Sequence, residues 1–98
     1  MVIQDVLTAL KDATSPVVKI LVKGENGKVI VLGFRKGLVL KEHKTGHSTR
    51  LVVIDGQINY FSARGTVTLS KFDELDIPVN EPHSVEALAD SICFLIQV

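Results

Sequence analysis

The sequence predicts an all-β fold, an antiparallel sandwich or barrel of about nine strands, with one short helix at its amino terminus. Short runs rich in β-branched residues follow one another from residue 17 to residue 97, and turn residues separate them at close spacing. No helical period returns between these runs, although a parallel sheet would need intervening helices. Helical spacing is confined to the first residues of the chain.

The helix is expected over residues 1–13. One apolar face is formed by residues at spacings of one, three and four, namely Val2, Ile3, Val6, Leu7 and Leu10. Pro16 ends the helical pattern because a proline disfavours helical geometry in the residue before it.

Nine segments are expected to be strands: PVVKILVKG, KVIVLGF, GLVLKEH, STRLVVI, QINYFS, TVTLSKF, LDIPV, HSVEALA and ICFLIQV. Residues 25–27, Glu-Asn-Gly, predict a hairpin between the first two, since Asn and Gly tolerate positive φ. The pair Asp55-Gly56 predicts a second hairpin between STRLVVI and QINYFS. The strands form a barrel over residues 17–97, and the whole chain, residues 1–98, is expected to be a single domain.

Charge and composition argue against several classes of protein. Eleven basic and eleven acidic side chains cancel, so no overall positive field would attract nucleic acid or an anionic membrane. No apolar run approaches the roughly 20 residues of a membrane-spanning helix. Cys93 is the only cysteine, which excludes an intramolecular disulfide, and Asp5 and Lys11 interrupt the amino-terminal segment where a signal peptide would be apolar. We therefore expect a cytoplasmic protein.

The strands before residue 35 are more uniformly apolar than the later ones. Two interpretations remain open. The excess could form the interface of a homodimer, or the helix could bury the first hairpin within one subunit.

Two stretches resemble the conserved motifs of the cupins, which are small jelly-roll barrels. The spacing of Gly37, His43 and Gly56 is similar to that of the first cupin motif. The stretch DIPVNEPHSVEA resembles the second, in which a proline precedes a metal-binding histidine by five positions, here Pro78 and His83. The likeness covers the whole predicted barrel. It implies an antiparallel jelly-roll (cupin) barrel with a ligand site in its lumen.

The resemblance also implies which residues face the lumen. The family's first motif supplies two histidines and a glutamate, and these positions are His43, Thr45 and Thr49 here. The histidine of the second motif is His83, so two of the four metal ligands are present. Asn80 replaces the glycine that usually follows the proline by two residues, and asparagine also tolerates the geometry of that turn.

His47 is the candidate for a third metal ligand. If the strand STRLVVI extends back by two residues, His47 and Thr49 share a face, because side chains alternate along a strand. Three protein ligands with open positions are typical of catalytic metal sites. The alternative is that Gly46 makes a turn and His47 faces water. Lys41 lies two residues before His43 and could share its inward face, where the ammonium could hold a carboxylate, or it could be a solvated edge residue.

These expectations describe a small barrel that binds a small molecule in its lumen, with a divalent metal such as Zn, Ni, Fe or Mn held by histidines as one means of binding. Two alternatives remain open. The resemblance implies a metal-dependent enzyme of the dioxygenase or isomerase type, acting on a small carboxylate-bearing substrate. The missing ligands favour a metal-free module for ligand sensing or dimerisation. The sequence does not decide whether the protein is an enzyme.

Overall fold

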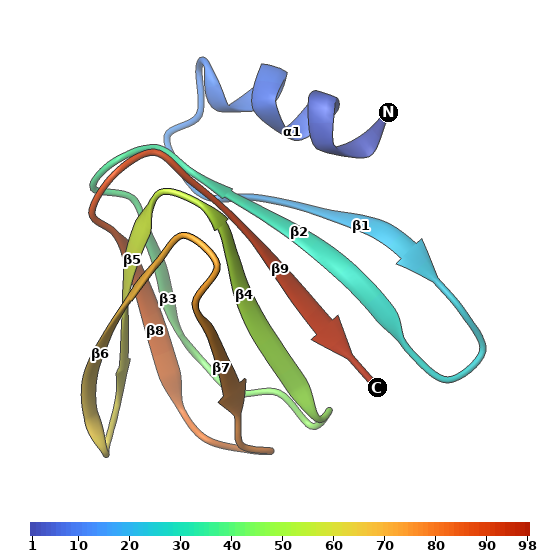
Figure 1. Ribbon diagram of the computed structural model, residues 1–98, viewed down its shortest axis with the longest axis vertical. Helices are drawn as coiled ribbons and strands as arrows, with labels where there is room; N and C mark the ends of the chain where they lie inside the picture. The colour runs from blue at the N-terminus through green and yellow to red at the C-terminus, as the bar shows by residue number, and fades with distance from the viewer.

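The computed structural model describes residues 1–98 as one helix and nine strands in two antiparallel sheets (Figure 1). The elements are α1 (Val2–Leu10), β1 (Val17–Lys23), β2 (Lys28–Phe34), β3 (Val39–His43), β4 (Thr49–Asp55), β5 (Gln57–Ser62), β6 (Gly65–Ser70), β7 (Glu74–Ile77), β8 (His83–Ala87) and β9 (Ser91–Gln97). The predicted fold class, the nine strands and the amino-terminal helix are confirmed. The helix ends at Leu10, three residues before the predicted end. No helix of the structure combines the length and the apolar character needed to cross a membrane.

The strands form a jelly roll. One sheet has the order β1-β2-β9-β4-β7 and the other has the order β3-β8-β5-β6. Alternating side chains of both sheets meet in one core, whose most completely buried members include Phe34, Leu51, Val53, Ile58 and Tyr60. The hairpin of β1 and β2 extends away from the second sheet (Figure 1). The space between the sheets is therefore less covered at the β1 edge.

The helix α1 covers part of the outer face of the five-stranded sheet. Val6 and Leu10 pack there against Val31 and Ile92 in a second, smaller cluster. Gly33 makes this close approach possible, because a Cβ at this position would lie only 2.6 Å from Val6 Cγ1. The last four residues of β2, 31–34, are consequently buried on both faces, so the interpretation that the helix buries the first hairpin is confirmed for this part of β2 only.

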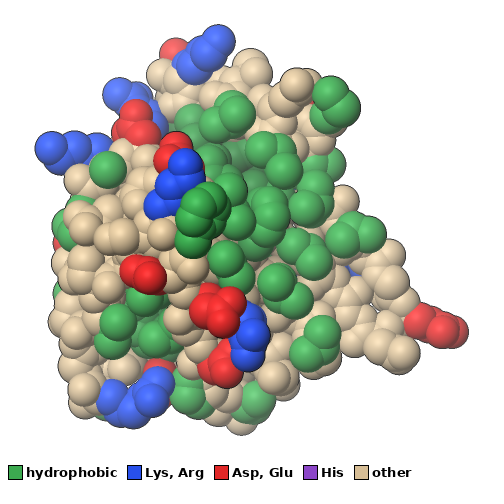
Figure 2. All heavy atoms as spheres, in the orientation of Figure 1, with side chains coloured by type: hydrophobic (Ala, Val, Ile, Leu, Met, Phe, Trp, Pro, Cys, Tyr) green, Lys and Arg blue, Asp and Glu red, His purple; other side chains and the backbone are tan.

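The strand β1 is different. Val18, Ile20 and Val22 are each about half exposed, at 53%, 48% and 57%. Hydrophobic side chains also gather on the visible face below α1 (Figure 2). This exposed apolar surface is compatible with the expected homodimer, which stays a prediction.

The hairpin predicted at Asp55-Gly56 is wrong. The strand β4 pairs with β7 and β9, whereas β5 pairs with β6 and β8, so this turn carries the chain from one sheet to the other. Gly56 has a φ of +90°, and a Cβ there would collide with the side chain of Ser91 and the carbonyl of Asp90. A glycine is required at this corner for the same backbone reason that favours it in a hairpin. The hairpin predicted at residues 25–27 is confirmed by the pairing of β1 with β2.

Candidate functional site

Two of the three histidines meet across neighbouring strands. His43 ends β3 and His83 begins β8, and the two residues are directly opposite in the antiparallel ladder. Their ring centroids are 4.3 Å apart and their planes are tilted by 55°. Both line the same cavity between the sheets, as expected from the two motifs.

A β-bulge sets the direction of His43. The register of β3 against β8 shifts between Leu40 and His43. Leu40 and His43 therefore both line the cavity although they are three residues apart, which simple alternation would not allow. The expectation that Lys41 shares the inward face of His43 is consequently wrong, since Lys41 does not line the cavity. Lys44 lines it instead, and the sequence pattern did not identify this residue.

Each histidine of the pair is oriented by a backbone carbonyl two residues before it. The Nδ1–H of His43 donates to the carbonyl of Lys41, and the Nδ1–H of His83 donates to the carbonyl of Glu81, each over 2.9 Å. A carbonyl oxygen only accepts hydrogen bonds, so Nδ1 must carry the proton. In the neutral form of each ring, the lone pair of Nε2 is then free to accept a hydrogen bond or bind a metal.

His83 is the more deeply placed of the two. Its exposed fraction is 3%, whereas His43 is exposed. The His83 ring stacks on the ring of Tyr60, with centroids 5.2 Å apart. Burial lowers the pKa of His83, and the hydrogen bond to the Glu81 carbonyl offsets part of this effect. His83 is thereby favoured in its neutral form.

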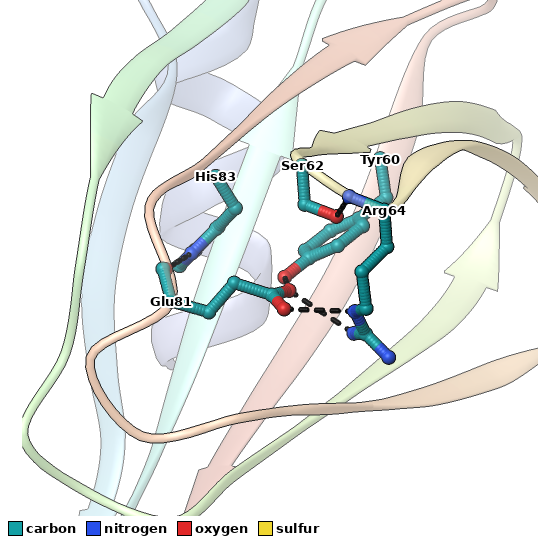
Figure 3. Close-up of polar contacts among 5 residues, drawn as sticks. All are labelled: Tyr60, Ser62, Arg64, Glu81 and His83. Atoms are coloured by element: carbon teal, nitrogen blue, oxygen red, sulfur yellow. Dashed lines mark hydrogen bonds and ion pairs between the residues drawn. The ribbon is translucent and has the colours of Figure 1, made fainter.

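Glu81 connects this histidine to a polar cluster that the sequence did not predict (Figure 3). The Tyr60 hydroxyl donates to Oε1 of Glu81 over 2.8 Å. Arg64 donates from Nε to Oε2 over 2.8 Å and from Nη2 to Oε1 over 3.1 Å. The Arg64 guanidinium, and after it the Tyr60 hydroxyl, lower the pKa of the Glu81 carboxyl. Burial, and then the bond to Glu81, raises the pKa of Tyr60.

The cluster fixes the residue that orients His83. The side chain of Glu81 is held by β5 and the β5–β6 turn, while its own carbonyl accepts the Nδ1–H of His83. The two side-chain partners of Glu81, Tyr60 and Arg64, come from a distant part of the chain, so no local spacing reveals them. Only the position of Glu81 two residues before a motif histidine could have drawn attention to it.

The cavity beside the histidine pair has a volume of about 290 Å³. It is lined by Val18, Ile30, Leu32, Leu40, His43, Lys44, Thr45, Thr49, Ile77, His83, Leu95 and Gln97. Thr45 and Thr49 therefore face the lumen, as the family positions implied. Asn80 has a φ of +61°, so it does adopt the turn geometry expected at the glycine position.

His47 does not join the pair. The strand β4 begins at Thr49 and does not extend back to His47, so the alternation expected between the two residues does not apply. The backbone N–H of His47 donates to Thr45 Oγ1 over 3.2 Å, and its carbonyl accepts from Thr49 Oγ1 over 3.0 Å. His47 borders a separate hollow, formed with the β1–β2 turn and the carboxyl-terminal residues 97–98. His47 therefore does not lie at the cavity of His43 and His83, where a third metal ligand would have to be.

The donor set fits part of a metal site. His43 and His83 present two Nε2 atoms, and both rings have the backbone partner on Nδ1 that is usual for metal-binding imidazoles. No group of three or more His, Cys, Asp and Glu side chains lies close enough to hold a metal. The pair could thus fill two positions of a divalent ion, and a bound molecule or water would have to fill the others.

No family model matches this sequence, and no curated protein matches it. Solved structures of similar shape do exist. An RmlC-like cupin protein from Desulfovibrio desulfuricans superposes with a TM-score of 0.80 at 21% identity, over 89% of this chain and 85% of that one. KdgF from Halomonas sp. gives a TM-score of 0.79 at 20% identity, over 88% and 82% of the two chains.

A cupin 2 conserved barrel domain protein from Leptotrichia buccalis is 30% identical, with a TM-score of 0.79. The match covers 89% of this chain but 42% of that one, so the similarity concerns the barrel and not the whole of the longer protein. The strand order, the paired motif histidines and these neighbours agree with one another. The chain folds as a small domain of the cupin superfamily.

Proposed function

We propose that this barrel binds a small molecule in its lumen, with the His43–His83 pair as the polar anchor. The observation that supports the proposal best is the shared orientation of the two rings. Both hold Nδ1 on a backbone carbonyl, and both border a cavity of about 290 Å³. Ligand cavities in proteins combine an apolar lining with placed polar groups, and half of the residues that line this cavity are hydrophobic.

A divalent metal is the second part of the proposal. The Nε2 atoms of His43 and His83 would hold it, and Thr45 and Thr49 replace side chains that would otherwise complete the shell. When bound, the ion would polarise or orient an oxygen atom of the ligand. Because an imidazole binds a metal in its uncharged form, the lumen would leave the charge of the ion uncompensated and would favour an anionic ligand.

Titration calorimetry with zinc alone would test the metal. We expect weak binding to the unaltered protein and loss of binding in His83→Ala and in His43→Ala. His47→Ala is the matched control, because this imidazole borders a different hollow, and its zinc affinity should equal that of the unaltered protein. Thr49→Glu should add a carboxylate ligand inside the lumen and raise zinc affinity at least about tenfold, in line with the effect of single groups on metal sites. Circular dichroism would establish that each variant is folded.

Equal zinc affinity in His43→Ala, His83→Ala and the unaltered protein would contradict the metal part of the proposal. A metal-free ligand-binding module is the second candidate function. It is favoured by the presence of two ligand side chains where catalytic zinc sites have three. Metal analysis of the purified protein, followed by NMR of the two imidazoles with small ligands before and after chelation, separates the two candidates. If the protein is a metal-dependent enzyme, metal analysis of the purified protein should find a bound metal.

A further inference from the structure

The two sheets give the cavity an apolar and a polar wall, because the five-stranded sheet supplies five of the six hydrophobic lining residues and the four-stranded sheet supplies both imidazoles. Six of its lining side chains are hydrophobic, namely Val18, Ile30, Leu32, Leu40, Ile77 and Leu95. The remaining six are polar and include both imidazoles of the pair. A ligand that fills this space must bury an apolar body against the first wall and place a polar group at the second.

The polar wall is suited to negative charge. No Asp or Glu lines the cavity, whereas Lys44, a cationic residue, is part of its lining. Thr45, Thr49 and Gln97 add neutral groups that can donate hydrogen bonds. A cationic ligand would find no counter-charge here, whereas a single carboxylate would find one.

The volume limits the size of the apolar body. A water molecule takes up about 30 Å³ of liquid, so the cavity of about 290 Å³ has room for about ten non-hydrogen atoms. This is at the lower end of the usual range for ligand cavities. The open β1 edge, where Val18 is 53% exposed, lets one end of the ligand reach solvent.

We infer that the lumen ligand is a small amphipathic monocarboxylate with an apolar body of about six to eight carbons along the apolar wall. Lys44 and the threonine hydroxyls would donate to its carboxylate beside the His43–His83 pair, and a divalent ion held by the two Nε2 atoms would bind the same carboxylate. The inference rests on the proposed function, because it places this ligand in the same site. It adds the charge, the polarity and the size of the molecule.

A series of simple ligands tests the inference. Acetate, butyrate, hexanoate, benzoate and hexylammonium would be titrated while the imidazole signals of His43 and His83 are followed by NMR, once with one equivalent of zinc and once after chelation. Each methylene buried against the apolar wall should raise the affinity about fourfold, so hexanoate should bind about fifteenfold more tightly than butyrate. Benzoate should exceed butyrate. Hexylammonium has a similar body and the opposite charge, and it should not bind.

Two pairs of variants locate the ligand. Lys44→Gln should weaken hexanoate binding several-fold, whereas Lys41→Gln should leave it unchanged, because Lys41 is also exposed but lies outside the cavity. Val18→Thr should weaken hexanoate and leave acetate unaffected. Val22→Thr alters an equally exposed valine of β1 that does not line the cavity, and it serves as the control.

The possible results separate the inference from the proposed function. Equal affinity for acetate and hexanoate, or for hexanoate and hexylammonium, would overturn the inference while the imidazole shifts would still support a lumen site. If no carboxylate and no zinc perturbs either imidazole, both the proposed function and the inference are wrong.

Discussion

Removal of the Tyr60 hydroxyl is the sharpest test of the cluster beneath His83. The hydroxyl donates to Oε1 of Glu81 over 2.8 Å, and Tyr60 is 1% exposed. Tyr60→Phe deletes this donor and leaves the ring in the core and against the imidazole of His83. The change therefore isolates one hydrogen bond without opening a large cavity.

The expected loss follows from the partner of this bond. A hydrogen bond to a charged group contributes about 1.5–3 kcal/mol to stability. The carboxylate of Glu81 keeps both bonds from Arg64 after the substitution, so it is not left without a donor. We therefore expect a value around the lower limit of this range, about 1–2 kcal/mol. For a domain of this length each kcal/mol lowers Tm by about 4–8 °C.

Urea unfolding of Tyr60→Phe should show a lower midpoint with an unchanged m value, which marks a change of stability alone. The same substitution in a Glu81→Gln background is the control. In this background the Tyr60 hydroxyl no longer bonds to a charged carboxylate, so Tyr60→Phe should lower the free energy of unfolding clearly less than it does in the unaltered protein. An equal cost in both backgrounds would refute the assignment of the stabilisation to the Tyr60–Glu81 bond. A loss below about 0.3 kcal/mol would refute it too, since that lies within the usual additivity error.

Two further predictions concern His83 and the oligomer. Burial lowers the pKa of His83, so as the pH falls below about 6.5 the unfolded chain binds a proton that the folded chain excludes. The free energy of unfolding should therefore decrease as the pH falls from about 6.5 to the lowered pKa of folded His83. The variant His83→Gln should lack this part of the decrease. If the free energy of unfolding of this variant and of the unaltered protein changed identically with pH, the prediction would be wrong. For the expected homodimer, light scattering should give the mass of two chains. Ile20→Asp should then give a folded monomer, whereas Val31→Asp, at a side chain with no exposed area beneath α1, should unfold the subunit. A single-chain mass for the unaltered protein would remove the dimer.

The strands could be predicted because their signals are local. β-branched runs and turn residues are read within a few positions, and all nine segments form strands. The corner at Gly56 could not be predicted in the same way. A glycine with positive φ suits a tight hairpin, and it equally suits a turn that carries the chain from one sheet to the other. The contact that distinguishes the two turns at Gly56 is made by Ser91, which lies far along the sequence. The Ser91 hydroxyl accepts the backbone N–H of Gln57 over 3.0 Å, which holds the new strand in its own sheet.

The sequence predicted the residues of the candidate site that occupy motif positions. It did not predict the residues that join the site through contacts between distant parts of the chain. His43, His83, Thr45 and Thr49 all line the cavity, as their place in the two motifs implied. The cluster around Glu81 joins a strand, a turn and a loop, and no periodicity in the sequence relates them. His47 was misplaced because the prediction extended a strand that begins at Thr49.

The bulge in β3 decides which lysine can act on a ligand. In a regular strand Lys41 and His43 would share a face, and Lys44 would lie on the other. The shift between Leu40 and His43 removes this relation, so Leu40 and His43 line the cavity together and the adjacent Lys44 reaches its edge. Such a bulge is tolerated because β3 is the edge strand of its sheet, where one side of the backbone has no strand partner to lose. The backbone irregularity thus decides which side chains of this segment line the cavity, and this cannot be counted from residue spacing alone.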